Sequence, residues 1–78
     1  MAEKTDADRI KETYVLCKTH FGDVKFVGIK YHAKIGWMAK AQLGDSFENL
    51  TADGKTSTEA IKNLRGRVKK IIKRYNGV

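Results

Sequence analysis

The sequence predicts an α+β domain in which two helices pack on one face of a three-stranded antiparallel sheet, in the order α-β-β-β-α. Apolar residues recur at helical spacing near both ends of the 78-residue chain, and apolar and polar residues alternate in its middle. Glycine-containing turn segments separate the alternating stretches. A sheet this small offers one apolar face, so we expect both helices to bury their apolar stripes on it.

Polar residues limit the first predicted helix at each end. Thr5 is a candidate N-cap, and Gly22-Asp23 ends the helix. Between these limits, four apolar residues lie at steps of three and four and therefore share one face: Ile10, Tyr14, Cys17 and Phe21. Residues 1–4 are expected to be a disordered N-terminus. Residues 5–78 are expected to form a single domain.

Three strands are predicted from the alternation that follows. Residues 27–32 and 37–43 alternate with period two, and the segment between them is short enough for a hairpin turn. Residues 47–52 form a weaker third strand before Asp53-Gly54. The polar positions of the first two strands define a second face, which is either solvated or a partner surface: Lys30, His32, Met38, Lys40 and Gln42.

The second predicted helix begins near Ser57, because Thr56 and Glu59 have the spacing of a capping box. Asn76-Gly77 supplies residues that tolerate a left-handed C-cap. The helix has an apolar stripe at steps of three and four: Ile61, Leu64, Val68, Ile71, Ile72 and Tyr75. A disordered basic tail would lack this stripe, so the segment is predicted to be folded.

The charge of this second helix is the strongest functional signal in a chain of net charge +7. Residues 60–78 contain no acidic residue and seven basic ones: Lys62, Arg65, Arg67, Lys69, Lys70, Lys73 and Arg74. Like charges three or four residues apart repel one another, and a face that serves only solubility usually mixes both signs. A solvated face is the alternative, but the pattern favours contact with a polyanion such as nucleic acid.

The order α-β-β-β-α with a basic second helix resembles the double-stranded RNA-binding domain. This resemblance implies RNA contacts from the first helix, the first hairpin and the start of the second helix. The matching positions in this chain are Glu12, His32, Lys34, Lys55 and Lys62. Where that family has paired lysines at the start of the second helix, this chain has Thr58-Glu59, and its charge lies further toward the helix C-terminus.

A second resemblance covers roughly residues 37–72. The segment from Gly54 to Ala60, followed by Asn63-Leu64, comes after a strand that contains Trp37 and Ala39. This arrangement is similar to the strand-to-helix junction of HicB-type antitoxins. It implies a small protein that neutralises a larger enzyme, such as a ribonuclease toxin.

We therefore expect a small basic RNA-binding protein that regulates or antagonises a step of RNA metabolism. Its second helix is expected to grip phosphates, and further contacts are expected from Lys34, Lys40, Lys55 and His32. The alternative is an antitoxin or phage-type inhibitor that binds a toxin or host enzyme directly. The sequence does not show whether the ligand is RNA or DNA, or whether it is a duplex or a single strand. It also leaves the oligomeric state open.

Aromatic side chains on an exposed sheet face can also bind nucleic acid by stacking with unpaired bases. The candidates in this chain are Phe26, Tyr31, Trp37 and Phe47. In a domain this small, most aromatic side chains are needed in the core. Trp37 alternates in phase with Ala39 and Ala41, so we predict that it belongs to the core.

Other classes of function receive little support. Structural zinc needs four ligands at defined spacing, whereas this chain has Cys17, His20 and His32. The two histidines are not spaced in a way that predicts an acid–base pair at one phosphodiester, so no catalysis, metal or cofactor is expected. The apolar runs are far shorter than the ~20 residues of a membrane-spanning helix. A cytoplasmic protein that does not bind membranes is expected.

Overall fold

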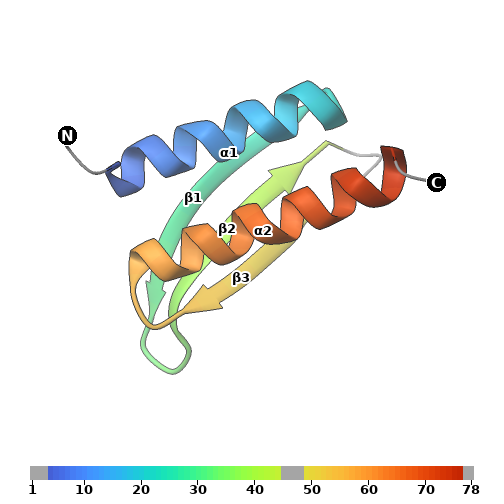
Figure 1. The fold of residues 1–78 in the computed structure, drawn as a ribbon. Helices are drawn as coiled ribbons and strands as arrows, with labels where there is room; N and C mark the ends of the chain where they lie inside the picture. Colours follow the sequence, from blue (N-terminus) through green and yellow to red (C-terminus); the bar gives the residue numbers. More distant parts are fainter. Residues whose placement is uncertain (1–3, 45–48, 77–78) are drawn as a thin grey trace.

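The structure is a computed structural model that describes residues 4–44 and 49–76 of the chain, with the backbone alone for residues 75–76. The described residues form five elements in the predicted order: α1 (Asp6–Phe21), β1 (Val24–His32), β2 (Gly36–Leu43), β3 (Leu50–Gly54) and α2 (Ser57–Asn76). Figure 1 shows both helices side by side on one face of the sheet. The predicted fold class is confirmed. Residues 1–3, the predicted start of the third strand at residue 47, and Gly77 of the predicted C-cap lie outside the described residues.

The ends of α1 follow the local chemistry of the sequence. The Thr5 hydroxyl accepts a hydrogen bond from the Asp8 amide, and the Asp8 carboxylate accepts one from the Thr5 amide, both at 3.1 Å. At the other end Gly22 has a φ of +85°, and its amide donates to the Lys18 carbonyl at 3.0 Å. Residues with a Cβ rarely adopt this conformation, so glycine ends the helix here.

The start of α2 forms only half of the predicted capping box. The Thr56 hydroxyl accepts from the Glu59 amide at 3.0 Å. The return bond from the Thr56 amide to the Glu59 carboxylate is not formed within the described part of the chain. Instead, the hydroxyls of Ser57 and Thr58 in the first turn donate to the Asp6 carboxylate of α1. The N-termini of the two helices are thereby tied together.

The sheet has the order β1-β2-β3, and both pairings are antiparallel. β1 begins at Val24, earlier than predicted, because a register shift between Val24 and Phe26 interrupts the period of two that marks a strand in sequence. β3 continues through Gly54, which the sequence predicted as a turn. An added Cβ on Gly54 would lie 2.4 Å from the Ala60 nitrogen, so this glycine allows close packing of β3 against the start of α2.

The core lies between the sheet and the helices. Its buried apolar residues come mainly from β2 and α2: Cys17, Ala39, Ala41, Leu43, Leu50, Ala60, Ile61, Leu64 and Val68. The alanines of β2 let α2 approach the sheet closely. The largest fully buried side chains of α2 are Ile61, Leu64 and Val68, each with no exposed surface. Burial of this stripe holds α2 in one orientation on the sheet.

Two predicted core positions differ from the structure in detail. In α1 the side chain of Thr13 is fully buried, whereas Tyr14, which the sequence places on the apolar stripe, is half-buried. The Thr13 hydroxyl donates to the Arg9 carbonyl at 2.8 Å, which satisfies it inside the core. Trp37 packs against the core at its edge, with its ring centroid 5.1 Å from that of Tyr31 in an edge-to-face pair.

The buried stripe of α2 can be tested by truncating one of its side chains. We expect Leu64→Ala to lower the free energy of unfolding by about 2–5 kcal/mol, because it removes apolar contacts and leaves a cavity under the helix. Val15→Ala on α1 is the matched control, since Val15 is 52% exposed and should change stability by less than about 0.5 kcal/mol. Urea unfolding followed by circular dichroism measures both. Equal effects of the two substitutions would contradict the described packing.

Candidate nucleic-acid interface

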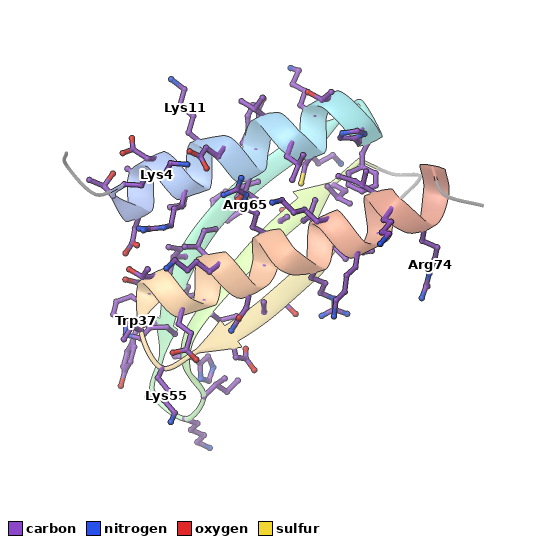
Figure 2. All side chains as sticks on the ribbon, viewed as in Figure 1. Lys4, Lys11, Trp37, Lys55, Arg65 and Arg74 are labelled. Carbon is purple, nitrogen blue, oxygen red and sulfur yellow. The ribbon has the colours of Figure 1, made fainter. Side chains whose placement is uncertain are left out.

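The solvent side of α2 carries a surface that we call the cationic face. It consists of five exposed basic residues: Lys62, Lys69, Lys70, Lys73 and Arg74. No ion pair or hydrogen bond within the described residues engages these side chains. Figure 2 shows Lys55 and Arg74 at opposite ends of the molecule. The 20-residue helix that carries the cationic face is about 30 Å long.

Arg65 is also predicted to bind a polyanion, but in the structure its guanidinium contacts α1. Its NH1 lies 3.1 Å from Oε2 of Glu12, and the Glu12 Oε1 lies 2.8 Å from the Lys4 ammonium. Figure 2 shows Arg65 pointing from α2 into the space between the two helices. The hydrogen bond from Lys4, with a smaller contribution from the charge of Arg65, lowers the pKa of the Glu12 carboxyl. Arg65 therefore links the helices, and its charge is partly compensated.

Arg67 also makes an internal contact. Its NH1 donates to the Thr51 carbonyl at 2.7 Å, and one turn earlier the Asn63 Nδ2 donates to the Asp53 carbonyl at 2.8 Å. Both carbonyls belong to β3, an edge strand whose outward backbone groups have no neighbouring strand to pair with. Two side chains of α2 thus cover this edge. The i, i+4 spacing of Asn63 and Arg67 indicates a shared helix face, but nothing in the sequence indicates that this face borders β3.

The remaining predicted contacts divide between two faces of the molecule. Lys34 in the β1–β2 turn and Lys55 in the β3–α2 turn are exposed, and both turns lie at the end of the molecule where α2 begins (Figure 1). His32 accepts from the Lys34 amide at Nδ1, at 3.4 Å, within the same turn. Lys40 lies on the opposite side of the sheet, because its neighbours Ala39 and Ala41 face the helices. The structure therefore does not bring Lys40 to the cationic face.

A shallow depression of 680 Å³ lies along α1 beside Arg65. Its rim carries charges of both signs, with Lys4 and Lys11 facing Asp8 and Glu12. The two carboxylates already accept hydrogen bonds or ion pairs from Thr5, Lys4 and Arg65. Compensated charges of both signs attract a polyanion less strongly than the one-sided charge of the cationic face.

The groups capable of acid–base or metal chemistry lie apart. His20 is in the last turn of α1 and His32 is at the end of β1, and the length of β1 separates them (Figure 1). Within residues 4–44 and 49–76, no group of three histidine, cysteine, aspartate or glutamate side chains could hold a metal ion. Cys17 is buried, and burial raises the pKa of its thiol to about 11. This thiol is therefore a poor nucleophile at neutral pH.

Neither of the described helices is long and apolar enough to span a lipid bilayer. Comparison of the chain with models of known protein families, with curated proteins and with solved structures found no match. The α-β-β-β-α order of the structure is compatible with the fold of the double-stranded RNA-binding domain that the sequence resembles. That shared order describes the topology of the chain and does not assign it to a family.

Asp6 fixes the position of α2 relative to α1, and its titration tests this link. Hydrogen bonds from the hydroxyls of Ser57 and then Thr58 lower the pKa of the Asp6 carboxyl below its ordinary value of 3.8. The folded protein therefore favours the carboxylate more than the unfolded chain does. This stabilisation is fully present above the ordinary pKa and is lost as the pH falls through the lower pKa of the folded state.

We expect Asp6→Asn to reduce the loss of stability that the wild type shows below pH ~4. The measurement is the thermal midpoint at a series of acidic pH values. Asp53→Asn is the control, since the side chain of Asp53 accepts no hydrogen bond within the described residues. Some acid sensitivity should remain in Asp6→Asn, because Asp8 and Glu12 also have lowered pKa values. Identical pH profiles for Asp6→Asn and the wild type would contradict the proposed link.

Proposed function

We propose that the protein binds RNA through phosphate contacts from the cationic face of α2, and that it regulates or antagonises a step of RNA metabolism in this way. The observation that carries the proposal is the division of α2 into two sides. One side is buried on the sheet, and the other presents five cations without a partner in the described residues. A folded domain gains nothing from this repulsion, whereas a polyanion relieves it.

The rigidity of α2 supports this proposal. Ile61, Leu64 and Val68 hold the helix on the sheet, so its cations are arranged before any ligand arrives. Binding then costs less conformational entropy than the ordering of a disordered basic tail would. Each cation that neutralises a phosphate releases condensed counterions, and this release provides affinity without reading the base sequence.

Gly66 gives the cationic face an open centre. On a helix its neighbours three and four residues away are Lys62, Asn63, Lys69 and Lys70. An added Cβ at Gly66 would meet no atom within 4 Å, so neither packing nor a close contact within the domain requires glycine there. Glycine in an exposed helix interior costs about 0.5–1 kcal/mol relative to alanine. Glycine at position 66 leaves room for a phosphate backbone to approach the helix closely between the flanking cations, and this approach accounts for the glycine.

The RNA contacts that we propose differ from those implied by the resemblance to double-stranded RNA-binding domains. The position in α1 that would contact the RNA groove is Glu12, and both of its carboxylate oxygens already face cations of this chain. Thr58 and Glu59 stand where that family has lysines, and the Thr58 hydroxyl donates to Asp6. Phosphate contact along α2 therefore fits this chain better than a minor-groove contact through its first helix.

Salt dependence tests the phosphate contacts directly. If the five cations of the cationic face each neutralise one phosphate, log K should fall with log salt with a slope of about −4.5 on a duplex. Lys69→Gln with Lys70→Gln should lower the affinity and reduce the slope by about 2. The control is Lys11→Gln with Lys18→Gln, which removes the same charge from α1. Fluorescence anisotropy with a labelled RNA duplex measures both, and a DNA duplex of the same sequence tests the preference for RNA.

An equal loss of affinity in both charge variants would show that overall charge, rather than the cationic face, determines binding. A different result would favour the alternative function, an inhibitor that binds its target enzyme directly. In that case this protein would bind no RNA, and its protein partner would stay bound after nuclease treatment. The ratio of absorbance at 260 and 280 nm after purification without nuclease gives an independent measure of copurified nucleic acid.

Substitution of Gly66 tests contact at the cationic face without a change of charge. We expect Gly66→Ala to raise the free energy of unfolding by about 0.5–1 kcal/mol. Gly66→Gln should fold equally well but lower RNA affinity, because its side chain fills the open centre between the lysines. Thermal unfolding and anisotropy measure the two effects. Unchanged affinity in Gly66→Gln would show that the ligand does not approach the helix at this point.

A further inference from the structure

The face of the sheet that points away from the helices is not covered by any part of the chain that the structure describes (Figure 1). We call it the open face. Its central positions are Phe26, Gly28 and Lys30 of β1 and Met38, Lys40 and Gln42 of β2. These residues alternate with Val27, Ile29 and the buried alanines of β2, which point toward the helices. The open face and the cationic face therefore lie on opposite sides of the molecule.

Phe26 places an aromatic ring on the open face. An added Cβ at Gly28 would lie 2.5 Å from the Phe26 Cζ, so the ring lies across Gly28 in a space that only glycine leaves free. The side chain of Phe26 nevertheless stays 51% exposed. A half-exposed ring held against the sheet in this way loses little further freedom when another ring stacks on it.

The groups around Phe26 are cationic or polar. Lys40 is the cross-strand partner of Gly28, Gln42 is the cross-strand partner of Phe26, and Lys30 follows Gly28 on the same face. Neither lysine forms an ion pair within the described residues. The acidic residue of the described strands on this face is Asp53, which lies on β3 at the far edge. The charged side chains of β1 and β2 that share this face with the ring are therefore cationic.

We propose that the open face binds single-stranded nucleic acid, with an unpaired base stacked on Phe26 and the adjoining phosphates on Lys30 and Lys40. An aromatic platform with flanking cations is what binding of single strands requires, because every base has a π-face and every nucleotide a negative charge. An acidic peptide would use the lysines but has no need of a ring held across glycine. This site goes beyond the proposed function of α2, since it uses other residues, another face and another form of nucleic acid.

The test compares single-stranded and duplex probes in substitutions of Phe26. We expect Phe26→Leu, which keeps apolar surface but removes the aromatic ring, to weaken binding of a labelled oligouridine about five- to one-hundred-fold. Phe26→Trp should retain the wild-type affinity because it restores a stacking surface. Neither substitution should change the affinity for an RNA duplex, and circular dichroism should show the same fold in both. Fluorescence anisotropy measures the affinities.

Gly28→Ala provides a second, independent variant. Its methyl group displaces the Phe26 ring without removing it, so oligouridine binding should weaken while the charge stays the same. Unchanged binding of oligouridine in Phe26→Leu, or no binding of oligouridine by the wild type, would overturn the proposal. So would equal binding of polyglutamate with the same dependence on Phe26. Phe26-dependent binding of oligouridine that persists in the Lys69→Gln, Lys70→Gln variant would support this site even if duplex binding fails.

Discussion

Burial of the apolar stripe of α2 on the sheet is the constraint on which the rest of the structure depends. Ile61, Leu64 and Val68 have no exposed surface, and they belong to the same buried cluster as the small side chains of β2. This contact decides which side of α2 meets water. The same 20-residue segment would be a flexible basic tail without it, and its charges would have no fixed arrangement. The fold of the domain and the order of its cations therefore have one cause.

The basic residues of α2 serve two different purposes, although they look alike in sequence. Those that point to solvent remain without partners in the described part of the chain. Arg65 and Arg67, at the two borders of the buried stripe, instead contact Glu12 of α1 and the Thr51 carbonyl of β3. Arginine suits such border positions because its long stem packs on apolar surface while its planar head forms several directed hydrogen bonds. Lysines dominate the solvent side, where a mobile point charge is sufficient.

The sequence predicts the elements of this fold well because the spacing of apolar residues, the capping residues of the helices and the glycines at their ends are local signals. Thr5, Gly22 and Thr56 mark helix ends in sequence, and they do so in the structure. The start of β1 was missed because a bulge hides the alternation, and the end of β3 because Gly54 serves packing rather than a turn.

The candidate sites were harder to predict because they depend on how distant segments meet. Periodicity places Arg65 alone close to the apolar edge, and the partners of Arg65 and Arg67 are more than ten residues away in sequence. Lys40 is expected as a further phosphate contact, although alternation places it on the second face of the sheet, and in the structure it lies there, away from the cationic face. Alternation places Phe26 and Gly28 on one face, but the sequence does not reveal that the ring lies across Gly28.

The contacts of Asn63 and Arg67 with β3 have a consequence for assembly. With the Thr51 and Asp53 carbonyls occupied, the edge of β3 is a poorer template for a strand from another molecule. The same contacts that hold α2 on the sheet therefore disfavour edge-to-edge growth of the sheet into fibres on this side.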